Sequence, residues 1–316
     1  MIASRAQATG SALADPAFLC CGGTWTTVEE EHVAVIPSDR RLPSALTDAV
    51  RRWREHGEPA QPASRWSRGS WLRRFPDHHT FLASLPESID RAEATRHAAR
   101  STTPEGAEAA FLVAMIWGYG PSGYGAWRTA RVLAENPRAA DRLAEVALVA
   151  RDRGGLAAFR DLADRPLRYL GVAFGTKYLR FVTAAQSSEP APILDAVVRR
   201  WLATHSGLRL NIDEWRPAVY EDYVALLTSW SEELALTADT VEQLIFRSAI
   251  SQEGSAAWGE QWAIAADAAM PPPARKAHAM LLELDRLFDT AEVRLAREAR
   301  RHLDELARII QQDWAD

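Results

Sequence analysis

The sequence has 316 residues, of which 47% are hydrophobic and 25% are charged, so it can bury a sizeable core and build two or three subdomains. Its formal net charge of −5 argues against a protein that coats nucleic acid with its whole surface. The chain shows no run of roughly 20 apolar residues and no signal-peptide pattern at its start, so we expect a soluble cytoplasmic protein.

Apolar residues recur at helical spacing from Ser44 onward and predict a mainly α protein, whereas residues 1–39 are weakly patterned and are expected to form a loosely ordered lead-in. The predicted helices include, in chain order, 104–117, 127–135, 138–151, 156–163, 177–185, 196–204, 221–231 and 240–250. After three prolines at 271–273, Arg and Glu at three-to-four spacing predict one or two long helices over 273–314. These helices would form an arm that is a candidate for binding a protein partner.

The charges are unevenly distributed along the chain. Residues 151–182 carry seven Arg or Lys against three Asp, whereas residues 211–242 carry eight Asp or Glu against one Arg. This pattern suits a protein that meets a phosphate backbone on one side, although solvated helix faces would explain it equally well. Trp66 and Trp71 lie among four arginines, a mixture typical of nucleic-acid surfaces but also common in arginine-rich proteins.

The cysteines and histidines predict neither a metal site nor a cofactor. Cys20 and Cys21 are adjacent and are the only two cysteines, so no set of four exists to hold an iron–sulfur cluster. His78 and His79 have no Cys or His partners at ligand spacing and are interpreted as part of a surface turn.

Lysine is rare in this sequence. Of the 37 basic residues, only Lys177 and Lys276 are lysines. Lysine can become a neutral nucleophile and arginine cannot, so a lysine in such a chain invites a chemical explanation. The alternative is chance, and Lys276 resembles an ordinary residue of a helix surface.

Residues 166–181 predict a helix, a turn bounded by Gly171 and Gly175, and a second helix. Glycine permits a positive φ and the close approach of a phosphate, while the free N–H groups at a helix start favour an anion. Thr176 is a candidate cap. Lys177 would then lie in the first turn of the second helix, where the helix dipole disfavours an ammonium and so favours the neutral amine.

Asp195 follows Lys177 by 18 residues and begins a helix with an apolar face. Aspartate is among the best N-cap residues, so a capping role alone would explain its presence.

The sequence Gly-Val-Ala-Phe-Gly-Thr-Lys at 171–177, followed 18 residues later by the aspartate of Ile-Leu-Asp at 193–195, resembles the helix-hairpin-helix DNA glycosylase superfamily, in particular 8-oxoguanine DNA glycosylase-like proteins. One difference is that Ala173 and Phe174 make the turn two residues longer than the Gly-Val-Gly that usually precedes the lysine. The resemblance implies two helical subdomains flanking a cleft.

The resemblance also implies a domain organisation. Residues 1–39 would be the lead-in, residues 40–265 the glycosylase-like catalytic region, and residues 266–316 a C-terminal helical extension.

By the same resemblance, Lys177 would attack the sugar C1′ and form a Schiff base, while Asp195 would stabilise positive charge on the sugar and orient its helix. Gly171, Gly175 and Thr176 would form the hairpin that holds the DNA backbone.

The resemblance assigns further residues to the DNA wedge and the base pocket. Tyr119 and Tyr124 are candidates for the wedge that fills the space left by a flipped base, unless they are tucked under a packed glycine turn. Glu242 and Phe246 lie one turn apart and correspond to a base-reading and a base-stacking residue, although Phe246 is also ordinary core material. Glutamine is the commoner reader, so Glu242 leaves the preferred base open.

The sequence therefore predicts a DNA glycosylase with lyase activity, acting on double-stranded DNA in base excision repair, with oxidised guanine as one candidate base. The alternatives are a non-catalytic DNA-binding protein that senses lesions, a glycosylase for hypermodified foreign DNA, and an interaction protein organised around the C-terminal arm.

Overall fold

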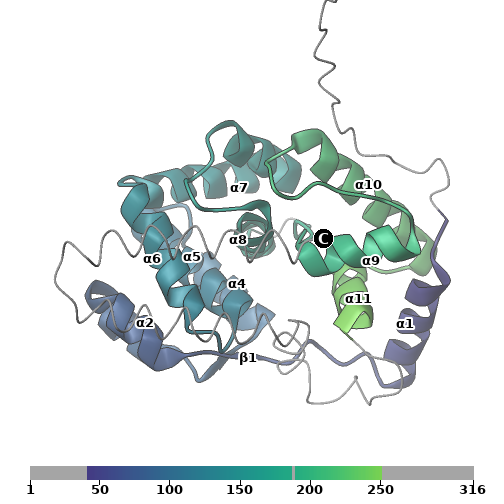
Figure 1. Cartoon of the computed structure of the whole chain (residues 1–316), viewed down its shortest axis with the longest axis horizontal. Helices are drawn as coiled ribbons and strands as arrows, with labels where there is room; N and C mark the ends of the chain where they lie inside the picture. The colour runs from purple at the N-terminus through teal and green to yellow at the C-terminus, as the bar shows by residue number, and fades with distance from the viewer. Residues whose placement is uncertain (1–40, 187–188, 251–316) are drawn as a thin grey trace, which may run out of the picture. The chain divides into compact units, whose positions relative to one another are not determined.

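The computed structural model describes residues 41–186 and 189–250 (Figure 1). In this part of the chain 70% of the residues are helical, which confirms the prediction of a mainly α protein. The helices are α1 (Ser44–Glu55), α2 (Arg68–Arg74), α3 (His79–Ser84), α4 (Arg91–Ala98), α5 (Pro104–Tyr119), α6 (Tyr124–Glu135), α7 (Ala139–Asp164), α8 (Val172–Ala185), α9 (Ala196–His205), α10 (Pro217–Leu234) and α11 (Ala238–Ile250), with a 3-10 turn at Pro76–His78. Two short antiparallel strands, β1 (Ser64–Arg65) and β2 (Ser88–Ile89), pair with each other.

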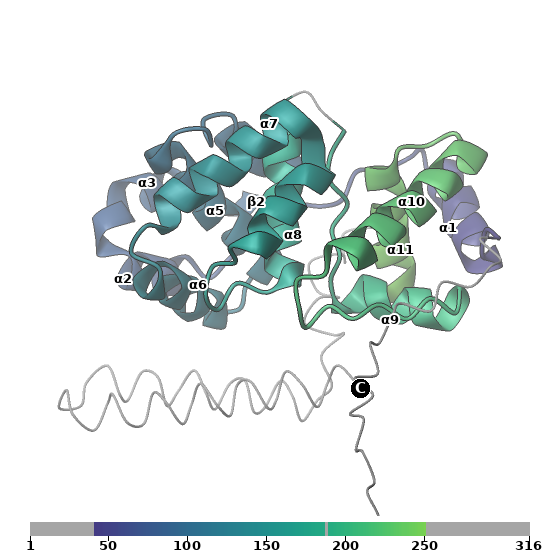
Figure 2. The same ribbon diagram turned by 90° about the horizontal axis from the view of Figure 1, so that it is seen from above.

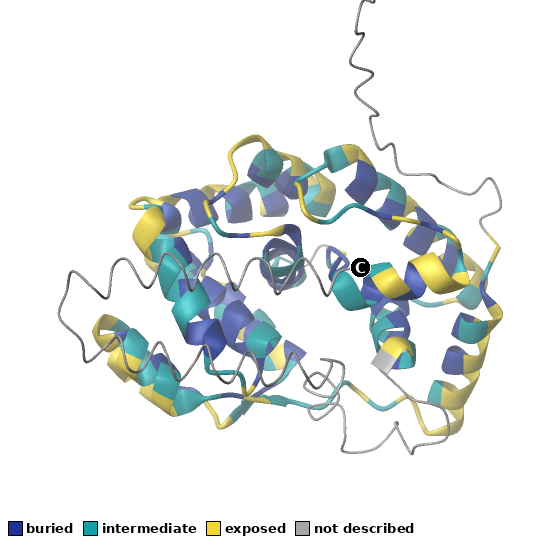
Figure 3. Cartoon of the chain, in the orientation of Figure 1, coloured by how far each residue is buried: buried dark blue, intermediate teal, exposed yellow. Residues whose placement is uncertain are grey.

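Helices α5 and α8 form the centre of one group of helices, together with α4 and α7 (Figure 2). Thr103 caps α5 by accepting a hydrogen bond from the backbone N–H of Gly106 at 3.2 Å, and Pro104 occupies its first position. Every residue of α5 from Ala110 to Trp117 is buried, as is every residue of α8 from Gly175 to Thr183 (Figure 3). A helix that is buried all round has to be enclosed by other helices, and this enclosure explains why α8 can carry a lysine into the interior.

A second group consists of α1, α9, α10 and α11, with α11 in contact with the other three. Two tyrosines of α10 fix the segment that leads into α9. The hydroxyl of Tyr220 donates to the carbonyl of Pro192, and that of Tyr223 donates to the carbonyl of Ile193, both at 2.7 Å. These bonds hold the chain immediately before Asp195.

All eight predicted helical ranges fall on α5 to α11, apart from one residue at the start of 138–151. The ranges 138–151 and 156–163 are the two halves of α7, which is interrupted at Gly154, where φ is 79°. Helix α8 begins five residues earlier than predicted, at Val172 instead of Lys177.

Some predictions concern parts of the chain outside the described residues. These are the lead-in, the cysteine pair, Lys276, the prolines at 271–273 and the C-terminal extension. None of the helices in the described residues is long and apolar enough to span a membrane.

Candidate active site

Lys177 lies in the second turn of α8 and is buried, with 7% of its surface exposed. The prediction that it occupies the first turn is wrong, because α8 begins at Val172. The helix dipole acts mainly within the first turn and therefore gives no reason for a neutral amine at this position. Burial and neighbouring groups define the environment of Lys177 instead.

The two glycines before Lys177 have roles that differ from those predicted. Gly171 is the N-cap of α8 with an ordinary φ of −85°, and Gly175 lies inside the helix. A Cβ atom on Gly175 would lie 2.1 Å from the Trp215 ring, so the packing of Trp215 requires glycine there. The positive φ of this loop, 66°, belongs to Tyr169.

Thr176 is buried and is not a helix cap. Its hydroxyl contacts the carbonyl of Val172 at 2.9 Å and accepts a hydrogen bond from the backbone N–H of Leu194 at 3.1 Å. Thr176 therefore joins α8 to the segment immediately before Asp195. This bond holds Lys177 and Asp195, the next residue on each side, close together.

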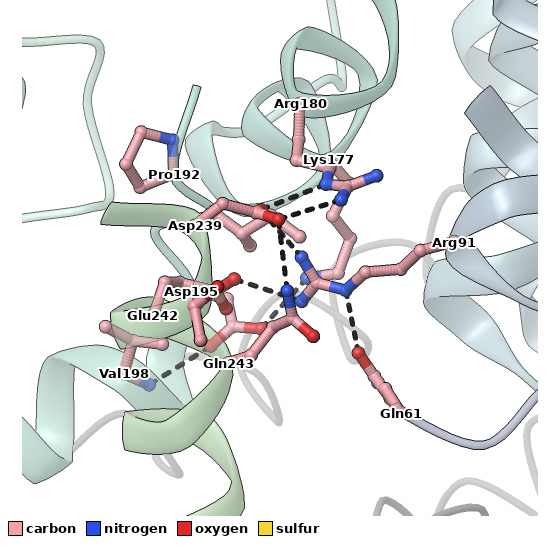
Figure 4. A network of polar contacts seen from close by, with 12 residues as sticks. Gln61, Arg91, Lys177, Arg180, Pro192, Asp195, Val198, Asp239, Glu242 and Gln243 are labelled. Atoms are coloured by element: carbon pink, nitrogen blue, oxygen red, sulfur yellow. Dashed lines mark hydrogen bonds and ion pairs between the residues drawn. The ribbon is translucent and has the colours of Figure 1, made fainter. Parts of the chain in front are cut away.

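Lys177 and Asp195 form a buried ion pair, with 2.9 Å between Nζ and Oδ2 (Figure 4). Nζ also lies 3.4 Å from the carbonyl oxygen of Ala173 and 5.1 Å from the centre of the Phe174 ring. On the apolar side, a Cβ atom on Gly118 would lie 2.7 Å from Cδ of Lys177. The lysine is thus enclosed by a carboxylate, an aromatic ring and a glycine backbone.

Asp195 is the N-cap of α9. Its Oδ1 accepts hydrogen bonds from the backbone N–H groups of Val197 at 3.0 Å and Val198 at 3.1 Å, while Oδ2 faces Lys177. Burial alone would raise the pKa of Asp195, but the charge and hydrogen bond of Lys177 and the two backbone donors outweigh burial and hold the pKa below its usual range. Asp195 is therefore an anion that serves as helix cap and as partner of the lysine.

A second set of buried charges adjoins this pair and was not predicted from the sequence (Figure 4). Arg91 of α4 contacts Asp239 and Glu242 of α11, each at 3.0 Å. Arg180 of α8 binds both oxygens of Asp239, at 3.0 and 2.8 Å. Burial opposes ionisation of Asp239, but Arg180 and Arg91 hold its pKa below the usual range. Arg180 follows Lys177 by three residues, so helical spacing could have identified it, whereas Arg91 has no local signal.

Glu242, the candidate base-reading residue, belongs to this second set and is 1% exposed. Burial and the negative charges of Asp239 and Asp195 raise its pKa to about 7, even though Arg91 acts in the opposite direction. The negative charge of Asp195 therefore acts on the carboxyl group of Glu242. Phe246 lies one turn further along α11 and is partly buried against the core.

The two candidate wedge tyrosines form part of an aromatic cluster. Tyr119 ends α5 and stacks on Phe174, with ring centres 3.9 Å apart, while Tyr124 begins α6 and is buried. Their own rings meet edge to face at 6.2 Å. This arrangement fits the alternative of tyrosines packed around a glycine turn in the DNA-free protein. Phe174, on which Tyr119 stacks, also contacts Lys177.

The tryptophans at 66 and 71 do not form an aromatic surface. Trp66 is 7% exposed and Trp71 is 0% exposed, so both belong to the core, and only their neighbouring arginines can reach solvent. Among the described residues, no three His, Cys, Asp or Glu side chains gather as a metal site would require.

A mainly helical fold with a buried lysine against a helix-capping aspartate agrees with the DNA glycosylase resemblance of the sequence. The chain belongs to the family described as "putative 8-oxoguanine DNA glycosylase OGG-like protein", whose model matches residues 57–246, and the resemblance stated from the sequence is thereby confirmed. No significant match was found among curated proteins or among solved structures.

Proposed function

We propose that this protein is a DNA glycosylase with associated lyase activity, in which Lys177 is the nucleophile and Asp195 the assisting carboxylate. The observation that carries the proposal is the buried ion pair between them, 2.9 Å long, in a chain with only two lysines. A buried pair contributes little net stability after desolvation, so its presence at this point of a glycosylase family member is better explained by chemistry.

The proposed reaction uses the lysine as an amine. Before attack, Lys177 has to leave its ion pair with Asp195 and give up a proton. The Nζ–C1′ bond then forms while the bond from C1′ to the base breaks, and the base leaves with the bonding electrons and takes up a proton. The amine then loses a second proton, the C1′–O4′ bond opens with its electrons going to O4′, which takes up a proton, and a Schiff base results. Removal of a C2′ proton then forms a C2′–C3′ double bond while the C3′–O3′ bond breaks, and the phosphate leaves with O3′, which nicks the strand.

Asp195 is suited to stabilising the positive charge that develops on the sugar. Its lowered pKa keeps it ionised, and the bonds to the start of α9 hold its carboxylate in place. Preorganised charge of this kind needs no rearrangement during the reaction and is typically worth 10²–10³ in rate.

The remaining assignments complete the proposal. The α4, α5, α7 and α8 group and the α1, α9, α10 and α11 group would be the two subdomains of a helix-hairpin-helix glycosylase fold, and DNA would enter between them. The loop before α8, with Gly171, would meet the DNA backbone, while Gly175 and Thr176 support α8. Glu242 and Phe246 would contact the flipped base. Of the two candidate wedge residues, Tyr119 would lie closer to Lys177.

Borohydride trapping tests the proposal, because it reduces a Schiff base to a stable protein–DNA adduct. We expect the full-length protein to be trapped on a duplex containing an abasic site, and on the modified base that it excises. In Lys177→Gln and Lys177→Arg the adduct should fall to the level of a protein-free control, since neither side chain is a nucleophile. Lys276→Gln removes the only other lysine in the sequence and should be trapped like the wild type.

The same experiment separates the rival functions. Tight binding of lesion DNA by the wild type without any adduct would favour a non-catalytic lesion sensor. Adduct formation by Lys177→Gln at the wild-type level would contradict the proposed nucleophile. A panel of duplexes with oxidised, alkylated and hypermodified bases identifies the substrate.

A further inference from the structure

The three buried carboxyl groups of the polar cluster differ in how well their charges are compensated (Figure 4). Asp239 is bound by two arginines, and Asp195 by Lys177 and two backbone N–H groups. Glu242 receives a single hydrogen bond, from Arg91 to its Oε2 at 3.0 Å, and it shares that arginine with Asp239. Glu242 is therefore the carboxyl group whose ionisation its contacts favour least.

The two oxygens of Glu242 have different surroundings. Oε2 receives Arg91, whereas Oε1 makes no hydrogen bond with any residue in the described part of the chain. A guanidinium can only donate, so the oxygen that it contacts is an acceptor whether or not the acid is protonated. A proton on this carboxyl group therefore belongs on Oε1.

Charged groups from several elements act on Glu242. Two negative groups, Asp239 one turn earlier on α11 and Asp195 at the start of α9, oppose the positive charge of Arg91 from α4. Further titratable groups of the cluster are Arg180 and Lys177 of α8, which pair with Asp239 and Asp195, and Tyr220 and Tyr223 of α10. Burial raises the pKa of both tyrosines, so they remain neutral. Burial and the two negative charges raise the pKa of Glu242 to about 7, where an acid can hold a proton and still release it.

Glu242 lies beside the proposed site of reaction. The charge of Asp195 acts on its carboxyl group, and Asp195 in turn lies 2.9 Å from Nζ of Lys177. In the proposed reaction Lys177 attacks C1′ while Asp195 faces the sugar, so the bond from C1′ to the base breaks next to these groups. Only 1% of Glu242 is exposed, so little water competes for its proton.

We propose that Glu242 is the general acid of base excision and that Oε1 delivers its proton to the departing base. This inference rests on the proposed function, because it concerns the same bond cleavage. As the bond from C1′ to the base breaks, the electron pair goes to the base, and the base takes the proton from Oε1. Glu242 is left as a carboxylate that Arg91 already contacts, and it regains a proton from solvent after the base has left.

General acid catalysis also indicates the class of base. A neutral base leaves as an anion unless it is protonated, so its departure gains from an acid. A base that is alkylated at a ring nitrogen and already carries a positive charge leaves as a neutral molecule and needs no proton. Glu242 therefore fits modified bases that are neutral when bound, which include oxidised purines.

The test measures single-turnover base excision by the full-length protein from pH 5.5 to 8.5. The substrate is the base that the panel of duplexes identifies, with 8-oxoguanine opposite cytosine tried first. Glu242→Gln keeps the size of the side chain and an oxygen for Arg91 but has no proton to transfer. At pH 6 we expect its excision to be about 10²-fold slower than that of the wild type. Borohydride trapping on a preformed abasic site, where no base has to leave, should stay close to the wild-type rate.

The ratio of the wild-type excision rate to that of Glu242→Gln isolates the proton of Glu242, because the protonation of Lys177 affects both proteins alike. This ratio should be constant below about pH 6 and should fall about tenfold per pH unit above the pKa of Glu242, which is about 7. Glu221→Gln is the matched control, because it makes the same change at a partly exposed residue of α10. It should excise the base at the wild-type rate throughout.

Three results would overturn the inference while trapping through Lys177 still supported the glycosylase. One is a ratio that does not change with pH, and another is excision by Glu242→Gln at the wild-type rate. The third is a wild-type protein that is trapped on abasic DNA but excises no base of the panel. Equal losses of excision and trapping in Glu242→Gln would also contradict it, since Glu242 would then only support the site. A wild-type protein that gives no adduct would instead overturn the proposed function itself.

Discussion

Two adjoining parts of the buried polar cluster hold their charges in different ways. Lys177 and Asp195 form one ion pair, and the lysine otherwise meets the carbonyl of Ala173, Gly118 and the ring of Phe174. In the neighbouring set, by contrast, Asp239 receives Arg91, Arg180 and the amide of Gln243, and so joins α4, α8 and α11. A single pair of opposite charges can be opened by a substrate, whereas the network resists opening because Asp239 is held by two cations at once. The first part is suited to chemistry, whereas Asp239 and its two arginines are suited to holding the helices.

Asp195 and Glu242 are neighbouring carboxyl groups, one from each part of the cluster, and their pKa values differ in the same way. Asp195 has a helix start and a cation to stabilise its charge, and its pKa is lowered. Glu242 lies in the middle of α11, where burial dominates, and its pKa is raised to about 7. Environments that separate the pKa values of neighbouring acids are typical of active sites, where one acid remains charged while the other can hold a proton.

Among these variants, we expect Asp195→Asn to have the largest effect, because it removes the negative charge of the ion pair. Asparagine can still cap α9, so the fold should survive, but the lysine loses its counter-charge and the sugar loses its stabilising anion. We expect single-turnover base excision to fall by about 10²–10³-fold. Trapping on a preformed abasic site, where no base has to leave, should fall much less. Equal losses in the two assays would mean that Asp195 only supports the position of Lys177.

Gly118→Ala tests the apolar side of the same pair. The new Cβ atom would lie 2.7 Å from Cδ of Lys177 and 3.1 Å from the Phe174 ring, so the lysine stem has to move. A displacement near 1 Å at a reacting group can cost about 10²-fold, so we expect a 10- to 100-fold slower excision with a small change in melting temperature. Gly69→Ala, in an exposed part of α2, is the control. Wild-type excision by Gly118→Ala would show that the amine tolerates other positions.

The sequence could predict the long helices because their apolar period of 3.6 residues is a local signal, and α5 to α11 follow it. The sequence mispredicts the start of α8 because a glycine at 175 also fits a turn, whereas in the structure Gly175 accommodates Trp215, 40 positions later. Likewise, the contact of Arg91 with Asp239 spans 148 positions and leaves no pattern in either segment. The approach of Lys177 to Asp195 was predictable only through the family resemblance, since spacing alone does not bring two helices together.

Glu242→Gln tests the raised pKa of Glu242 through the pH dependence of protein stability. This is the smallest of the effects that we predict. Between its ordinary pKa of 4.5 and its folded value of about 7, Glu242 keeps a proton in the folded state that the unfolded chain has released. The free energy of unfolding therefore decreases as pH rises through this window, and the loss is complete above pH 7. Glutamine cannot ionise and still offers an oxygen to Arg91, so it removes most of this loss. At pH 8 we expect the variant to be more stable by about 1–2 kcal/mol, or roughly 3–6 °C in melting temperature, with little difference at pH 5.

Melting curves of the wild type and the variant at both pH values measure this effect. Glu221→Gln is the matched control, because Glu221 is a partly exposed residue of α10 whose pKa is lowered by its hydrogen bond to Arg160, and its removal should change stability by less than about 0.5 kcal/mol. A Glu242→Gln variant that melts below the wild type at pH 8 would mean that Glu242 is ionised and that Arg91 depends on its charge. Asp195 and Glu242 would then both be ionised in the folded protein. Only Lys177 would distinguish the part of the cluster that we assign to chemistry.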